Sequence, residues 1–148
     1  MPTLRLFAPC ERVILGQGDN SASLIVVIQQ LQFMGLQESI SPNAGALARF
    51  SIFSQWHSAV GDGQKMFEQK IEMSITNEPP KIEVVTEFEM REKVHRIVAN
   101  WSVLPVLKAG EYFFRIYLRE KGQSNWGRAL AEYPIEVVHI PLMQPQPQ

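Results

Sequence analysis

Apolar and polar residues alternate along most of this chain with the two-residue period of half-buried β-strands. Segments rich in β-branched and aromatic residues carry the pattern, and none shows the 3.6-residue period of an amphipathic helix. We therefore predict eight strand segments, near residues 4–15, 22–34, 46–57, 65–76, 81–90, 94–104, 111–120 and 129–140.

Several predicted strands separate an apolar face from a charged one. In "KIEVVTEFEM", residues 81–90, the apolar side chains alternate with Glu83, Glu87 and Glu89, and "MFEQKIEMSI", residues 66–75, alternates with Glu68, Lys70 and Glu72. Because one face of each strand is apolar, these faces are expected to meet in a shared core. The predicted core is Ile25, Val27, Phe50, Ile52, Trp56, Phe88, Ile97, Trp101, Tyr112, Phe114 and Ile116.

The connections carry residues that end strands. "GQGDNS" and "VGDGQ" supply glycines that tolerate positive φ, "NEPPK" supplies prolines that interrupt a ladder, and "EKGQSNWG" has the composition of a hairpin loop. This spacing predicts an all-β, two-sheet antiparallel sandwich of seven to nine strands over residues 1–141. Residues 142–148 are predicted to be a disordered Pro/Gln-rich tail, and residues 35–45 are left unassigned.

The stretch "HRIVANWSVLPVLKAGEYFF", residues 95–114, makes the predicted topology immunoglobulin-like. An alternating strand is followed by a crossing connection and then by Gly110 and Tyr112, the Gly-x-Tyr pattern of a tyrosine corner. In such a corner the Tyr hydroxyl bonds to the backbone upstream. Phe114 stands where a secreted relative has its disulfide cysteine, which suits a reducing compartment.

Two longer stretches resemble a family of small uncharacterised bacterial β-sandwich proteins with immunoglobulin-like topology. These stretches are "CERVILGQGDNSASLIVVIQQLQF" and "LKAGEYFFRIYL". The family closes with a Pro-x-x-Gly-x-Tyr-x-Phe-x-Leu type strand, whereas here Pro105 lies five residues before Gly110. The resemblance implies the sandwich fold, and it implies no activity.

Charge and composition narrow the classes of function. The 148 residues include 14 basic and 15 acidic ones, a formal charge of -1, so a nucleic-acid partner is disfavoured. The longest apolar run, "SLIVVI", is too short to span a bilayer, and the first residues lack the pattern of a secretory signal. With Cys10 as its one cysteine, the chain is expected to be cytoplasmic.

Candidate catalytic and metal-binding residues are few. His57 and Asp62 form the best available dyad, near a Gly-rich turn, but no Ser or Cys stands in a nucleophile elbow. Cys10 is expected to be a buried structural cysteine, and His95 a core or sheet-edge residue. The His and Cys spacings match no metal site. We therefore predict a protein that is not an enzyme and needs no metal or cofactor.

Two surfaces are candidates for binding. Trp126 and Arg128 lie in the polar loop "GQSNWGR", where the Trp either contacts a partner or folds back over the sandwich. In "AGEYFFRIYLREK", one face carries a mixed aromatic and basic stripe. This stripe either binds a ligand or pairs with the acidic strands of the same sheet, and the second interpretation is favoured. The stripe residues are Phe113, Arg115, Tyr117 and Arg119.

The predicted function is a non-enzymatic interaction or structural module with a protein partner or a second copy of itself. A homo-oligomer would form through an edge strand or through the aromatic face. The alternative is a module that binds carbohydrate or single-stranded nucleic acid through the exposed aromatic and Arg residues. A hydrolase using the His57 and Asp62 dyad is the third hypothesis.

Overall fold

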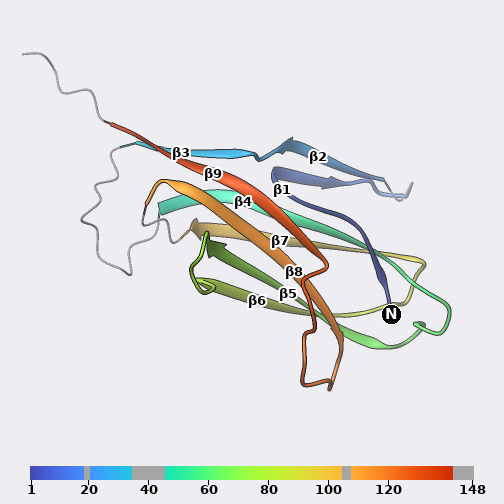
Figure 1. The fold of residues 1–148 in the computed structure, drawn as a ribbon. Coiled ribbons are helices and arrows are strands. Elements are labelled where there is room, and N and C mark those ends of the chain that lie inside the picture. Colours follow the sequence, from blue (N-terminus) through green and yellow to red (C-terminus); the bar gives the residue numbers. More distant parts are fainter. Residues whose placement is uncertain (19–20, 35–45, 105–107, 142–148) are drawn as a thin grey trace, which may run out of the picture.

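The structure of the protein, a computed structural model, describes residues 1–18, 21–34, 46–104 and 108–141. Within these ranges the chain forms nine strands and no helix, arranged in two packed sheets (Figure 1). The all-β, two-sheet prediction is therefore confirmed. The unassigned residues 35–45 and the predicted tail 142–148 lie outside the described ranges. The strands are β1 (Thr3–Leu15), β2 (Ala22–Val27), β3 (Gln30–Met34), β4 (Ala46–His57), β5 (Met66–Ile75), β6 (Ile82–Glu89), β7 (Val94–Leu104), β8 (Gly110–Glu120) and β9 (Ala131–Ile140).

The two sheets have the strand orders β2-β1-β4-β7 and β3-β9-β8-β5-β6. Strands β4 and β7 have the predicted bounds, and the remaining predicted segments each match one strand to within two residues at either end, except the segment 22–34. That segment divides between the two sheets: β2 pairs with β1 in one, and β3 pairs with β9 in the other. The sandwich is therefore built from nine strands where the pattern indicated eight segments.

The core lies between the sheets and consists of the alternating apolar positions. Nine predicted core residues are buried: Phe50, Ile52, Trp56, Phe88, Ile97, Trp101, Tyr112, Phe114 and Ile116. Phe67, Ile71, Met73, Ile135 and Val137 also belong to it. The prediction was wrong for Ile25, which is only half-buried, and for Val27, which is exposed.

The change of sheet explains these two errors. Val26 has a φ of 51°, which is unusual for a β-branched residue and interrupts the alternation of β2. The next residues cross to the other sheet, and Ile28 enters the core in place of Val27. Strand β3 then runs parallel to β9, so the prediction of a wholly antiparallel sandwich was wrong for this pair.

The predicted hydrogen bond of the tyrosine corner is confirmed. The Tyr112 hydroxyl donates to the backbone carbonyl of Lys108 over 2.9 Å. Gly110 precedes it with a φ of +145°, a conformation that side chains rarely adopt. Two residues after Tyr112, Phe114 is fully buried and its ring lies 5.5 Å from that of Trp101 and 5.8 Å from that of Phe50. This corner fixes the start of β8.

A polar contact is also enclosed in the core. Gln69 lies on the inward face of β5 and is fully buried. Its side-chain oxygen accepts hydrogen bonds from Trp56 Nε1 over 2.9 Å and from Ser54 Oγ over 2.6 Å. The two hydrogen bonds satisfy the buried side-chain oxygen and link β4 to β5 across the two sheets.

Candidate functional site

The aromatic and basic stripe of β8 lies beside the charged face of β5. In the antiparallel register Arg119 is opposite Glu68, Tyr117 is opposite Lys70, and Arg115 is opposite Glu72. The expectation that the stripe pairs with acidic strands of its own sheet is therefore confirmed. These side chains point away from the core, because they alternate with the buried residues of both strands. We call this group of contacts the outer-face network.

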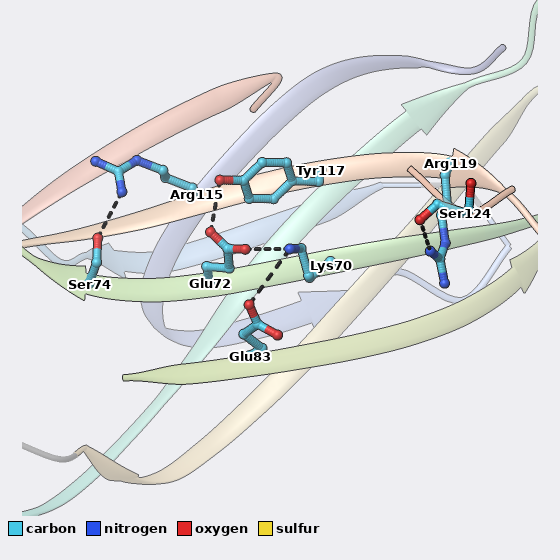
Figure 2. A network of polar contacts seen from close by, with 8 residues as sticks. All are labelled: Lys70, Glu72, Ser74, Glu83, Arg115, Tyr117, Arg119 and Ser124. Atoms are coloured by element: carbon cyan, nitrogen blue, oxygen red, sulfur yellow. Dashed lines mark hydrogen bonds and ion pairs between the residues drawn. The ribbon is translucent and has the colours of Figure 1, made fainter. Parts of the chain in front are cut away.

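Lys70 is at the centre of the outer-face network (Figure 2). Its ammonium contacts a carboxylate oxygen of Glu72 and lies 3.7 Å from a carboxylate oxygen of Glu83. The other Glu72 oxygen accepts a 2.8 Å hydrogen bond from the Tyr117 hydroxyl, and the Tyr117 ring lies 4.5 Å from Lys70 Nζ. Lys70 and Glu72 are both buried, so the contacts replace solvation that the two charges have lost.

These contacts change the acidities of Glu72 and Tyr117. Burial alone raises the pKa of Glu72, but the hydrogen bonds from Lys70 and Tyr117 outweigh it and the net pKa is lowered. Burial and the hydrogen bond to the Glu72 carboxylate raise the pKa of Tyr117 to about 12. The network is therefore most stable with Glu72 ionised and Tyr117 protonated.

Titration of the tyrosines tests this arrangement. We expect the Tyr117 phenol to ionise near pH 12, and this step to disappear in Tyr117→Phe. Because the folded-state pKa lies above its ordinary value of 10.0, the contribution of Tyr117 to stability is complete below pH 10 and is lost as pH approaches 12. Phenolate absorbance measures the step, and a Tyr117→Phe protein that keeps it would contradict the assignment.

The two arginines of the stripe are also paired. Arg119 contacts the Glu68 carboxylate, and it donates over 3.3 Å to the carbonyl of Ser124. Arg115 donates over 2.5 Å to Glu132 of β9 and over 2.9 Å to the Ser74 hydroxyl. Their charges are thus compensated inside the sheet, which leaves little free positive potential for a phosphate or another anion.

Trp126 folds back onto the same face. Its ring lies 4.0 Å from the Arg119 guanidinium carbon and 5.2 Å from Lys70 Nζ, both in cation–π geometry. This is the second of the two arrangements considered for the loop between β8 and β9. Arg128 is exposed in that loop, and the described residues give it no ion pair. The structure therefore brings Trp126 together with the stripe and leaves Arg128 apart.

The Asp62 carboxylate orders the turn between β4 and β5. One oxygen accepts the Ala59 N–H over 2.7 Å, and the other lies 2.9 Å from the Met1 amino group. Burial raises the pKa of Asp62, but these two partners outweigh it and hold the pKa below its ordinary value. His57 contacts the side chain of Gln55 at 3.5 Å. These partners give both members of the candidate dyad structural contacts.

The remaining candidate residues also occupy structural positions. The Cys10 thiol is fully buried, donates to the Ser51 carbonyl, and has a pKa raised by burial. The His95 ring stacks on Phe88 at 4.8 Å, and burial lowers its pKa. Among the described residues, no three His, Cys, Asp or Glu side chains gather as a metal site. Nor does this part of the chain contain a helix with the length and apolar character needed to cross a bilayer.

A surface that the sequence patterns missed lies on the hairpin formed by β2 and the second half of β1. We call residues 10–18 and 21–27 the β1–β2 hairpin. Four of its large apolar side chains are exposed, and both faces of the hairpin carry them. They are Ile14 (47%), Leu15 (49%), Val26 (62%) and Val27 (43%). Beyond Cys10, β1 pairs with β2 and no longer with β4, so this part of the hairpin has one neighbouring strand.

A hollow of about 770 Å³ opens near β6 and β7. Its lining combines acidic residues, Glu87, Glu89 and Glu92, with basic ones, Arg91 and Arg96. Glu89 is already paired with Arg91 over 2.7 Å. The lining therefore carries charges of both signs without a single dominant one.

Comparison with known proteins identifies no relative of this chain. The chain matches no protein-family model, and no curated protein matches it with significant similarity.

Proposed function

We propose that this protein is a non-enzymatic interaction module of immunoglobulin-like topology that binds another protein chain through the β1–β2 hairpin. The observation that carries the proposal is the exposed apolar surface formed by Ile14, Leu15, Val26 and Val27. Large apolar side chains exposed on both faces of one hairpin cost solubility, and exposed apolar patches in soluble proteins mark sites of association. On a short hairpin at the edge of a sheet, it suits a protein partner better than a small ligand.

The outer-face network supports a structural role for the other candidate surface. A ligand-binding stripe would present cations or aromatic faces without partners, whereas Arg115, Arg119 and Lys70 each contact a carboxylate. Trp126 covers two of these cations. Carbohydrate or single-stranded nucleic acid would have to displace these contacts before binding.

The topology proposed here has two supports. The five-stranded sheet ends in a short strand that runs parallel to the last strand of the chain, and Tyr112 makes the corner contact expected of immunoglobulin-like sandwiches. The buried thiol of Cys10 and the apolar Phe114 suit the proposed cytoplasmic setting, because neither depends on an oxidising compartment. The resemblance to uncharacterised bacterial β-sandwich proteins stays a prediction.

Affinity capture from a lysate of the source cells tests the proposed function. Tagged protein is compared with Leu15→Lys, which places a charge on the hairpin, and bound chains are quantified after cross-linking. We expect chains retained by the wild type to fall about tenfold or more with Leu15→Lys, because binding would bury a charge without a partner.

Leu130→Lys is the matched control. Leu130 is 47% exposed and lies in the loop between β8 and β9, and Leu15 is 49% exposed on the hairpin. Retention should be unchanged with Leu130→Lys. Equal retention by the wild type and Leu15→Lys would show that the hairpin is not the binding surface.

A further inference from the structure

We propose that the partner is a second copy of this chain, which docks along the free edge of β2 in antiparallel pairing across a two-fold axis. This inference rests on the proposed function, because it specifies which chain the hairpin binds. The pairing would join two four-stranded sheets into one continuous sheet, with the order β7-β4-β1-β2 continuing into β2 of the second copy.

The free edge of β2 lacks the usual protection against strand pairing. Exposed edges are normally blocked by charged side chains, by proline or by cover from another element. The six residues of β2, "ASLIVV", contain no charge and no proline, and β1 is the only strand that pairs with them in the described sheets. The edge is therefore open to a strand that is itself uncharged.

The other edges are less suited to pairing with their own copies. β6 carries Glu83, Glu87 and Glu89, so self-pairing would bring like charges together. β7 carries Arg96 and ends next to residues outside the described ranges. β3 is uncharged, but two of its three exposed positions are glutamines; the third is Met34, its last residue, and a segment outside the described ranges follows it. Charge and apolar exposure together favour the pairing of β2 with β2 of a second copy.

Symmetry limits the register of this pairing. A two-fold axis perpendicular to a sheet preserves its faces. Because directly opposite residues of an antiparallel pair share a face, the residue next to the axis must be opposite the same residue of the second copy. Val26, with its φ of 51°, ends the regular part of the strand, which leaves Ala22–Ile25 for the ladder. The axis then passes midway between the two Ser23 residues or midway between the two Leu24 residues. In either case the two Ser23 side chains share a face and lie within about 8 Å of each other.

Charge exchange at Ser23 tests the pairing. Ser23 is exposed, so Ser23→Lys and Ser23→Glu leave the core of each copy unchanged. Sedimentation of the purified wild type over a range of concentrations should show a monomer–dimer equilibrium. Each variant alone should dimerise about tenfold or more weakly, because like charges meet at the axis. An equimolar mixture of the two should recover dimers as a mixed pair.

Val85 supplies the matched control. It lies on the edge strand β6 and is 50% exposed, so Val85→Lys and Val85→Glu place the same charges on a different edge. Dimerisation should be unaffected by either substitution. A wild type that stays monomeric, a Ser23→Lys variant that dimerises normally, or an exchange effect at Val85 and not at Ser23 would each overturn the proposal.

The two proposals fail in different ways. One outcome is that the purified chain is monomeric while the wild type captures another protein from the lysate and Leu15→Lys does not. In that case the hairpin binds a different chain, and only the second-copy inference is wrong. If capture is insensitive to Leu15→Lys and the chain is monomeric, the proposed function is wrong as well.

Discussion

Replacement of Phe114 by alanine is expected to destabilise the protein by about 3–5 kcal/mol, as found for other large-to-small changes of buried aromatic residues. Phe114 is fully buried, and its ring packs against those of Phe50 and Trp101 from the opposite sheet. Alanine would leave a cavity that these two rings cannot fill without moving. Denaturant unfolding followed by tryptophan fluorescence measures the change in the free energy of unfolding.

Phe113→Ala is the control for this prediction. Phe113 is the preceding residue of β8 and lies on the outer face of the same sheet, half-buried beside the Arg115 guanidinium at 5.6 Å. Its truncation removes one weak cation–π contact and should cost about 1 kcal/mol or less. If Phe113→Ala were as destabilising as Phe114→Ala, the assignment of the two faces of β8 would be wrong.

The contrast between these neighbours was predictable from the sequence. Alternation alone assigned Phe114 to the core and Phe113 to the outer face, and it also placed Arg119 and Glu68 on polar faces of opposite charge, which the structure puts side by side on one sheet. Such local periodicity survives folding, because a one-residue slip would expose the whole apolar face of a strand. The same reasoning located the buried core residues of β4, β6, β7 and β8.

Three features could not be predicted in this way. The alternation of residues 22–34 gives no sign that φ becomes positive at Val26 and that the chain then changes sheet. The pattern likewise identifies Trp126 as a loop residue but cannot indicate which side chains it covers, because Lys70 and Arg119 lie on two other segments of the chain. The hairpin surface was missed because apolar positions of β2 were assumed to face the core. All three features depend on which strands and side chains meet across long distances in the sequence.

Removal of the Glu72 carboxylate is the second large effect that we expect. Glu72→Leu should destabilise the protein by about 3 kcal/mol, because it leaves the buried Lys70 ammonium without its nearest carboxylate. We choose the lower end of the range for broken buried pairs, because Glu83 remains 3.7 Å from Lys70. Urea unfolding measures the loss, and Glu87→Leu, which breaks an exposed pair with Lys121, should cost about 1 kcal/mol or less.

The double variant Lys70→Met with Glu72→Leu separates the cost of an unpaired charge from the value of the pair. Well-packed apolar replacements for a buried pair are often neutral, so the double variant should recover most of the stability lost in Glu72→Leu. A pH series gives an independent check. Since the pKa of Glu72 is lowered from 4.5 in the folded protein, its contribution to stability is complete above that pH and is lost as pH falls through the folded-state value. The wild type and Glu72→Gln should therefore converge in stability under acid conditions, and a constant difference between them would show that the Glu72 charge does not organise this face.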